Sequence, residues 1–332
     1  MSNKVLVTGA TGFIGGNLVR LLLRQGCQVR ALVRPSSDLK NLENLDVEKV
    51  YGDLNDKKSL VKACDDCEQL YHVAASYQFW SSDPQEFYAS NVEGTRNILE
   101  AARQTHIPKI VYTSTVGTIC YPSHPSEFSD ETRWPTQKDL HNDYKRSKFQ
   151  AEQVALQFAK EGLPVVIVNP SAPIGAYDIK PTPTGKIIVD FINGKVPAYL
   201  ETGLNIIDVE DVAMGHWLAA QKGKIGERYI LGNKNVSLKA IYTLIAHLTG
   251  KEPPKVRIPY AVAWGAAVVS EALGKFSGKR PKISLGAVKM AKHYMYFSPA
   301  KAVRELGLPQ SPIEKAFAKA IEWFKNNGYL KG

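Results

Sequence analysis

Through the first half of the chain, short β-branched runs alternate with longer segments whose apolar residues recur at helical spacing. The short runs favour strands and the longer repeats favour helices, so the alternation predicts βαβ units around a parallel sheet. The predicted strands are Lys4 to Val7, Val29 to Val33, Val47 to Tyr51, Gln69 to His72, Lys109 to Thr113 and Val165 to Asn169. The predicted helices between them are Ile14 to Arg24, Lys57 to Ala63, Pro84 to Ala102 and Asp143 to Lys160.

After Asn169 the pattern stops, because prolines and glycines interrupt the sequence from Pro170 to Gly185. Beyond them we expect helices near Ile187 to Asn193, Leu238 to Thr249, Ala261 to Leu273 and Pro312 to Asn326, and two strands, Asn205 to Asp208 and Arg228 to Leu231, that return to the first sheet. The predicted fold is α/β: a doubly wound parallel-sheet Rossmann domain over 1–170 with a returning segment near 205–231, and a smaller, interleaved C-terminal substrate lobe over 171–204 and 232–332.

The composition is that of an ordinary globular protein, with 332 residues, 44% hydrophobic and 22% charged. No apolar run reaches the roughly 18 residues of a membrane span, and no cleavable leader is recognised, so a cytoplasmic chain without a transmembrane segment is expected. Four cysteines are too few for a disulfide scaffold. Cys64 and Cys67 lack a second ligand pair at zinc spacing, so no metal is expected.

The net charge of +10 is uneven, since Lys275 to Arg304 contains eight Lys or Arg and no acidic residue. Such a segment could attract nucleic acid, an anionic membrane surface or an acidic substrate. Its basic residues are scattered among apolar ones, as on a solvated helix, and no nucleic-acid recognition motif accompanies them. We therefore expect a small-molecule substrate and no nucleic-acid partner, with a homodimer possible.

The sequence Thr8 to Gly15, TGATGFIG, lies between the first predicted strand and the first predicted helix. That context is what a dinucleotide-binding turn requires, although a plain glycine-rich turn is the alternative. Gly9 would permit the tight turn, Gly12 the close approach of a pyrophosphate, and Gly15 the packing of helix on strand. The helix N-terminus would then face the anion.

The end of the second predicted strand bears on the choice of cofactor. An acidic side chain there binds the ribose of NAD, whereas an arginine accommodates the 2′-phosphate of NADP. Here Val33 is followed by Arg34, Ser36 and Ser37 without an acid, and these side chains can donate to a phosphate. The pattern favours NADP(H), with NAD(H) held through Asp38 as the alternative.

Tyr144 and Lys148 are four residues apart on a predicted helix and so share a face. A nearby ammonium stabilises a phenolate and lowers its pKa, which makes the tyrosine a competent acid/base. The hydroxyl run Thr113-Ser114-Thr115 follows the fifth strand at the carboxyl edge, where doubly wound sheets bind their ligands. A hydroxyl there can orient a substrate carbonyl.

Together these motifs resemble the extended short-chain dehydrogenase/reductase family over essentially the whole chain. Asp53-Leu54 resembles its adenine-contacting pair, His72 to Ala75 its fourth-strand loop, and Asn91 to Thr95 its NxxGT segment. The resemblance implies that Tyr144 is the acid/base, Lys148 its partner, and Thr115 the catalytic hydroxyl, with Ser114 as the alternative. The predicted cofactor-binding residues are Gly9, Thr11, Gly12, Phe13, Ile14, Gly15, Arg34, Asp53, Leu54, Ala74, Ala75, Asn91, Thr113, Tyr144, Lys148 and Pro170.

Val165 to Gly175, Asp178 to Lys186 and Tyr144 to Glu152 are similar to hopanoid-associated sugar epimerases, while dihydroflavonol-reductase-like enzymes share the arginine after the second strand. Sugar epimerases usually hold NAD permanently and carry an acid where this chain has Arg34. Their substrate-domain signature is replaced here by Asn169 to Pro173. Both departures favour a reductase that uses exchangeable NADPH.

The leading hypothesis is an NADP(H)-dependent oxidoreductase that reduces an aldehyde, ketone or dihydroflavonol-like carbonyl, with Tyr144 as general acid. The alternative is an NAD-dependent nucleotide-sugar epimerase, and a non-catalytic cofactor-binding scaffold is disfavoured by the intact catalytic set. Tyr77 and Trp80, with Phe79, are candidate walls of an apolar substrate pocket or else local core aromatics. His141 is a weaker candidate for substrate contact.

Overall fold

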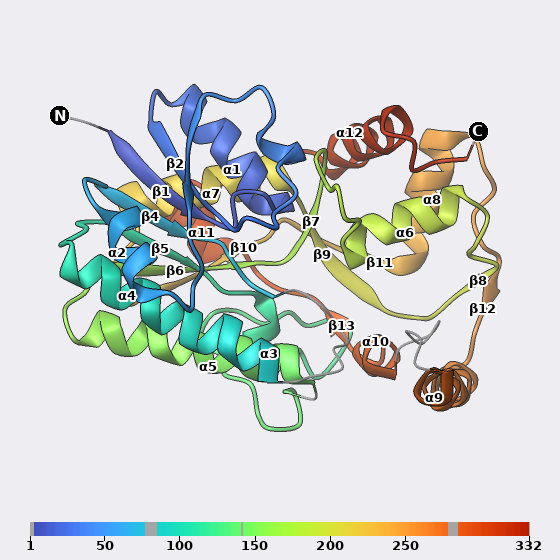
Figure 1. Cartoon of the computed structure of the whole chain (residues 1–332). Helices are drawn as coiled ribbons and strands as arrows, with labels where there is room; N and C mark the ends of the chain where they lie inside the picture. The colour runs from blue at the N-terminus through green and yellow to red at the C-terminus, as the bar shows by residue number, and fades with distance from the viewer. Residues whose placement is uncertain (1–2, 77–84, 141, 278–284, 332) are drawn as a thin grey trace.

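The larger part of the molecule is a seven-stranded, entirely parallel sheet with helices on both faces (Figure 1). This computed structural model describes residues 3–76, 85–140, 142–277 and 285–331. The strand order is β10-β6-β5-β4-β1-β2-β3. The strands are β1 (Lys4–Thr8), β2 (Gln28–Val33), β3 (Val47–Tyr51), β4 (Gln69–His72), β5 (Ile110–Thr113), β6 (Val165–Pro170) and β10 (Arg228–Leu231). The predicted doubly wound fold is confirmed.

Alternate side chains of β1 show how the sheet is built. Val5 and Val7 pack into a buried cluster with α1 (Phe13–Arg24), α7 (Val209–Lys222) and α11 (Ala300–Leu306). Leu6 points to the opposite face, where α2 (Lys57–Cys64), α4 (Gly94–Gln104) and α5 (Asp143–Lys160) cover the sheet. Because both faces are buried, the inner strands consist largely of apolar residues, whereas the edge strand β3 is partly exposed.

The first half follows the sequence prediction closely, and the main differences are one divided helix and the unpredicted α7 of the second half. The helix predicted from Pro84 to Ala102 is divided into α3 (Gln85–Tyr88), a π-helical turn (Ala89–Glu93) and α4. α7 was not predicted, and it packs along α1 on one face of the sheet. Its residues Val212, Ala213, Leu218 and Ala219 are buried in the same cluster as α1, which explains why the chain returns to the sheet after β9.

The smaller lobe is built on a second, mixed sheet of β7 (Ala172–Ile174), β9 (Gly203–Asp208), β11 (Lys234–Ser237) and β13 (Tyr294–Met295). β7 follows β6 almost directly, and β9 leads straight into α7, so the two sheets are joined by crossing segments (Figure 1). α6 (Pro183–Ile192), α8 (Leu238–Thr249) and α12 (Ile313–Asn326) pack against this sheet around a separate apolar cluster.

One strand prediction needs correction. Asn205 to Asp208 does form a strand, but it belongs to the lobe sheet and not to the first sheet. It is the central β9, paired with β7, β11 and β13, and Asn205 bridges β11 and the segment after β13 by donating to Asn235 Oδ1 and the Phe297 carbonyl. Only Arg228 to Leu231, observed as β10, joins the first sheet, beside β6.

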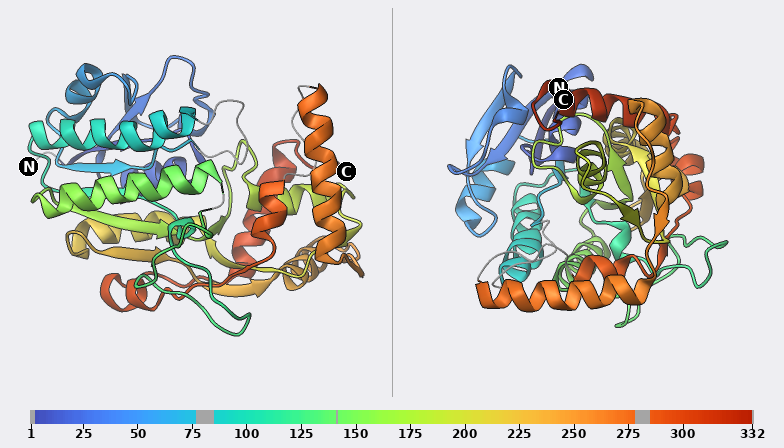
Figure 2. Two further views of the ribbon diagram at one scale, coloured as in Figure 1. Left: turned by 90° about the horizontal axis from the view of Figure 1, so that it is seen from below. Right: turned by 90° about the vertical axis from the view of Figure 1, so that its right-hand side faces the viewer.

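The rest of the lobe consists of β8 (Ala198–Tyr199) paired with β12 (Val256–Arg257), α9 (Tyr260–Ser277) and α10 (Leu285–Met290). α9 lies along the outer edge of the molecule in both views of Figure 2, and Val262, Val269 and Leu273 on it are exposed. Among the described residues, no helix has both the length and the hydropathy of a membrane span.

Candidate active site

The turn between β1 and α1 is formed by glycines that no other residue could replace without movement. Gly9 has a left-handed φ of 70°. A Cβ there would lie 2.6 Å from the Ala74 nitrogen, and a Cβ at Gly15 would lie 2.1 Å from the Gly9 carbonyl oxygen. The turn therefore packs directly on the loop after β4, with Gly12 as the N-cap of α1. This is a cradle that fits a dinucleotide pyrophosphate.

The buried side chain of His72 stabilises the glycine turn through hydrogen bonds. Burial lowers the pKa of His72 to about 3, so its ring is neutral. The Thr95 hydroxyl donates to the Asn91 carbonyl oxygen at 2.6 Å, and it therefore accepts the His72 Nε2–H at 3.1 Å. The remaining nitrogen, Nδ1, accepts from Thr8 Oγ1 at 2.7 Å, and that oxygen accepts from the Ala74 N–H. The chain of hydrogen bonds joins β1, β4 and α4.

At the other end of the cradle lie Arg34, Ser37 and Asp53, all of which line the same cavity. Arg34 is exposed, and its backbone N–H donates to Ser37 Oγ at 3.1 Å. Asp53 Oδ1 is engaged in its own turn, where it accepts from the Asn55 N–H. Asp38, the acid considered for an NAD ribose, is exposed, accepts from the Lys40 N–H and is absent from the lining. The arginine is thus the charged group after β2 that faces the cavity.

Tyr144 and Lys148 lie in the first two turns of α5 and both line the cavity. Lys148 is 2% exposed, and its Nζ donates to the Thr113 carbonyl at 2.8 Å and to Tyr112 Oη at 3.2 Å. Burial lowers the pKa of Lys148 to about 8. The ammonium is therefore fixed against β5, on the helix face it shares with Tyr144.

Ser114 and Thr115 differ in what their hydroxyls already bind. Ser114 is 5% exposed, and its Oγ lies 3.4 Å from Thr118 Oγ1. Thr118 donates to a carboxylate or carbonyl oxygen, so Ser114 supplies the hydrogen of that contact. Thr115 is half-buried, and its Oγ1 accepts from the Gly117 N–H at 3.1 Å, which leaves its own hydrogen free to donate. Both residues line the cavity.

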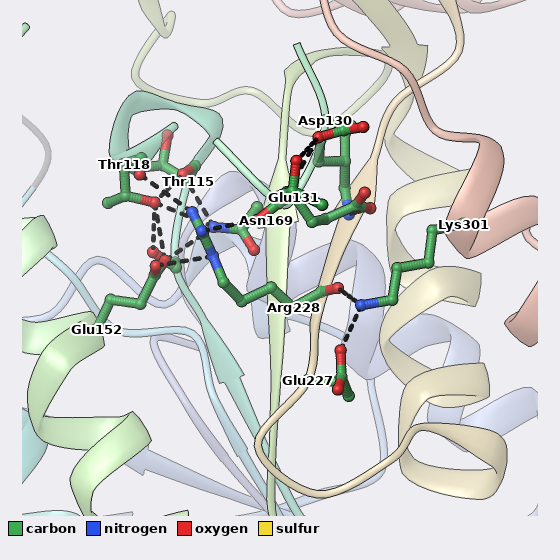
Figure 3. Close-up of polar contacts among 12 residues, drawn as sticks. Thr115, Thr118, Asp130, Glu131, Glu152, Asn169, Glu227, Arg228 and Lys301 are labelled. Carbon is green, nitrogen blue, oxygen red and sulfur yellow. Dashed lines mark hydrogen bonds and ion pairs between the residues drawn. The ribbon is translucent and has the colours of Figure 1, made fainter. Parts of the chain in front are cut away.

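A buried polar network supports the loop that carries Thr115 (Figure 3). The Glu152 carboxylate is fully buried, accepts from Thr118 Oγ1 and Asn169 Nδ2, both at 2.8 Å, and forms an ion pair with Arg228 Nε at 3.0 Å. Asn169 also donates to the Thr115 carbonyl at 3.1 Å, and Arg228 to the Thr118 carbonyl at 3.0 Å. α5, β6 and β10 thus fix one loop through charged hydrogen bonds.

One cavity of about 1080 Å³ connects the glycine turn, Arg34, the hydroxyls of Ser114 and Thr115, and the Tyr144–Lys148 pair. Its first wall comes from the glycine turn, the strand ends of the large sheet and the start of α5, and it is rich in polar atoms. Its second wall, from the smaller lobe, contains no charged side chain among the described residues. That wall is lined by Ser171, Ala172, Pro173, Thr182, Pro183, Thr184, Ile187, Thr202, Leu204, Leu238, Met290, Ala291, Met295 and Phe297.

The structure brings nearly all of the predicted site residues to this cavity. Of the predicted cofactor-binding residues only Asn91 is absent from the lining, since it lies behind the wall and donates to Ser147 Oγ while accepting from the Ser76 N–H. Tyr77, Trp80 and Phe79, and likewise His141, lie outside the described residues.

Sequence reasoning missed three groups near the site: Tyr121, Lys145 and His216. Tyr121 and Lys145 line the cavity, and His216 Nε2 lies 2.9 Å from Thr113 Oγ1 behind it. No spacing rule in the sequence relates them, because each contact joins separate elements.

Cys64 and Cys67 are buried free thiols, and no three metal-binding side chains converge among the described residues.

Comparison with known proteins agrees with this geometry. The profile of the NAD dependent epimerase/dehydratase family matches residues 5–232. A Synechocystis sp. protein that carries a dihydroflavonol 4-reductase name is 48% identical over 335 residues, which cover 100% of this chain and 97% of that protein. Sterol demethylase protein B of Methylococcus capsulatus is 34% identical over 98% of this chain and 99% of its own length.

Among solved structures, a nucleoside-diphosphate-sugar epimerase from Pseudomonas aeruginosa superposes with a TM-score of 0.81 at 27% identity. The superposition covers 99% of each chain. Relatives that carry reductase names and relatives that carry epimerase names thus share this fold over its full length. The shared fold does not decide between the two reactions, which depend on the residues of the site.

Proposed function

Since the chain belongs to the NAD-dependent epimerase/dehydratase family, whose members are NAD(P)-dependent oxidoreductase-type enzymes, we propose that it reduces an uncharged carbonyl compound with NADP(H). The substrate would be an aldehyde, a ketone or a dihydroflavonol-like ketone. The observation that carries this proposal is the second wall of the cavity, where the described lining residues from the smaller lobe are all uncharged.

A nucleotide-sugar would place a diphosphate against that wall. Binding a diphosphate away from water requires cationic or many N–H donors, because a buried unpaired charge is costly. Thr182, Thr184 and Thr202 provide hydroxyls, and Leu204, Met295 and Phe297 provide apolar surface. This lining supports a largely apolar substrate and disfavours the epimerase alternative.

The first wall fits NADP(H). The glycine turn and the N-terminus of α1 would hold the pyrophosphate, Arg34 and Ser37 the 2′-phosphate, and Lys148 the nicotinamide ribose through its third N–H. Asp38 is exposed and does not line the cavity, which supports NADP(H) over NAD(H). When bound, the cofactor supplies the hydride.

The chain's own residues would handle the proton and the geometry. Thr115 would donate to the substrate carbonyl oxygen, since its Oγ1 already accepts from Gly117. Tyr144 would deliver the proton to the same oxygen as hydride reaches the carbon, which gives an alcohol. The Lys148 ammonium, held by the Thr113 carbonyl, would stabilise the phenolate left on Tyr144.

The test is to purify the protein, denature it, identify any released cofactor, and then supply NADPH with a panel of aldehydes and ketones. A reductase exchanges cofactor every cycle, so we expect little bound cofactor and NADPH oxidation in step with carbonyl loss. Stoichiometric bound NAD, no reduction of any carbonyl, and interconversion of a nucleotide-sugar would establish the epimerase instead.

A further inference from the structure

Lys145 is a buried lysine that the proposed chemistry leaves without a role. It follows Tyr144 directly, so it points about 100° around α5 from the face that Tyr144 shares with Lys148. Even so, Lys145 is only 2% exposed and lines the same cavity. Its backbone N–H donates to Asn142 Oδ1 at 2.8 Å, so the N-cap of α5 fixes where its side chain starts.

The ammonium of Lys145 binds the phenol of Tyr121. Its Nζ donates to Tyr121 Oη and, at 3.3 Å, to the Asp139 carbonyl, and it lies 3.9 Å from the centre of the Tyr121 ring. Within the described residues, no carboxylate forms an ion pair with Lys145, although the Asp139 carboxylate lies near enough to stabilise the ammonium electrostatically. Because Tyr121 Oη accepts this hydrogen bond, the phenolic hydrogen of Tyr121 can be donated into the cavity.

Tyr121 is packed beside the loop that carries Thr115. Its ring stacks on His293 with centroids 5.0 Å apart and packs in a buried cluster with Ile119 and Phe297. Both Lys145 and Thr115 pack against Gly117. A Cβ on Gly117 would lie 3.7 Å from Lys145 Cε and 3.3 Å from Thr115 Cγ2. The Lys145 side chain therefore runs alongside the loop that carries Thr115.

Packing alone does not account for this pair. Burial of the ammonium lowers the pKa of Lys145 to about 7, so the charged form is held at a cost in stability. A buried cation without an ion-pair partner is destabilising compared with an apolar side chain of similar size. A methionine would fill the same space, so the amine is better explained by what it does to Tyr121 and to a ligand.

We propose that Tyr121, polarised by Lys145, binds a second oxygen of the substrate, apart from the carbonyl that is reduced. The inference rests on the proposed function and narrows its substrate class to largely apolar carbonyl compounds that carry a hydroxyl or second carbonyl oxygen. Tyr121 donates its hydrogen to that oxygen, and the Lys145 ammonium strengthens the donation through a charge-assisted hydrogen bond. A substrate without this oxygen leaves a buried donor unpaired.

The experiment measures binding without turnover. Protein loaded with NADP⁺ is titrated by calorimetry with flavanone and with its monohydroxylated derivatives at the 3, 5, 7 and 4′ positions. The variants are Tyr121→Phe, Lys145→Met and Lys145→Gln, so that one failure to fold does not end the test. Arg146→Met removes a cation from the solvent side of the same helix, and Tyr242→Phe removes a buried hydroxyl that does not line the cavity.

We expect one hydroxyl position to improve binding to the wild-type protein about tenfold, and each site variant to remove that gain. The two control variants should preserve it. If no derivative binds better than flavanone, or if Tyr121→Phe and Lys145→Met weaken flavanone and its derivatives equally, the second-oxygen site is wrong. Because oxidised cofactor is used, no carbonyl is reduced during the titration, so the second-oxygen site is measured separately from the reductase activity that the NADPH assay tests.

Discussion

The two walls of the cavity are built by different means. The wall from the large sheet is fixed by buried hydrogen bonds, such as those that join Thr8, His72 and Thr95, and by the Arg228–Glu152 ion pair (Figure 3). The wall from the smaller lobe consists mainly of apolar side chains such as Leu204 and Met295, on short strands. In the first wall, directional hydrogen bonds fix the positions of individual atoms. In the second wall, apolar packing determines only the shape and volume of the cavity.

This difference assigns the tasks of the enzyme to separate regions. Hydrogen bonds have fixed directions, so the first wall can hold a cofactor and a proton donor within narrow limits. Apolar contacts are non-directional, so the second wall can change its substrate by changing volume. Tyr121 and Lys145 are the proposed exception, a directional contact for the substrate itself.

The largest effect should come from the chemistry of the first wall. Tyr144→Phe removes the proposed proton donor, so turnover should fall by about 10²- to 10⁴-fold. Binding of NADPH, measured by fluorescence, should be little changed because the glycine turn is intact. Near-normal turnover in this variant would move the proton transfer to another group.

The next largest effect is expected on stability, from loss of the Arg228–Glu152 ion pair. Arg228→Met leaves Glu152 buried and unpaired, which should lower the free energy of unfolding by about 3–5 kcal/mol. The double variant Arg228→Met with Glu152→Met should recover much of this loss, since no charge remains buried. Urea denaturation of both variants and of the wild type measures the difference. Equal instability of the single and double variants would contradict the pair's role.

Arg34 tests the cofactor end of the first wall. Arg34→Ala should weaken NADPH binding roughly 10- to 100-fold, because a charge-assisted contact to the 2′-phosphate is lost. NADH binding should not change, and Asp38→Asn should leave both affinities as they were. Fluorescence titration decides this, and equal wild-type affinities for NADPH and NADH would overturn the cofactor preference.

A substitution in the second wall should change KM more than kcat. Leu204→Ala enlarges the cavity, so the KM of an apolar carbonyl substrate should rise about tenfold with little change in kcat. The NADPH affinity should stay the same. A loss of NADPH affinity in Leu204→Ala would show that the two walls are not separate in function.

Near neutral pH, the smallest effect is expected from the titration of Lys148. The Lys148 ammonium is present below its pKa of about 8 and is lost above it, so kcat should halve near pH 8 and continue to fall. Lys145→Met should show the same fall of kcat above pH 8, which would assign the fall to Lys148 and not to Lys145. A kcat that stays level to pH 10 would show that the charge on Lys148 is not needed.

The sequence predicted the first wall far better than the second, for a physical reason. The glycine turn, Arg34 and the Tyr144–Lys148 pair each lie within one short segment, so local spacing specifies them. β9 is central to the lobe sheet only because it pairs with strands from distant parts of the chain. The contact between Lys145 and Tyr121 likewise joins α5 to the loop after β5, and no local pattern encodes it.

The proposed reaction is tested most directly by following the hydride. NADPH with both C4 hydrogens of the nicotinamide replaced by deuterium is supplied with a carbonyl substrate, and the product is examined by mass spectrometry. We predict one deuterium on the former carbonyl carbon of the alcohol, in equal amount to the NADPH consumed. Unconsumed NADPH, together with interconversion of a nucleotide-sugar by an NAD that stays bound, would contradict the account.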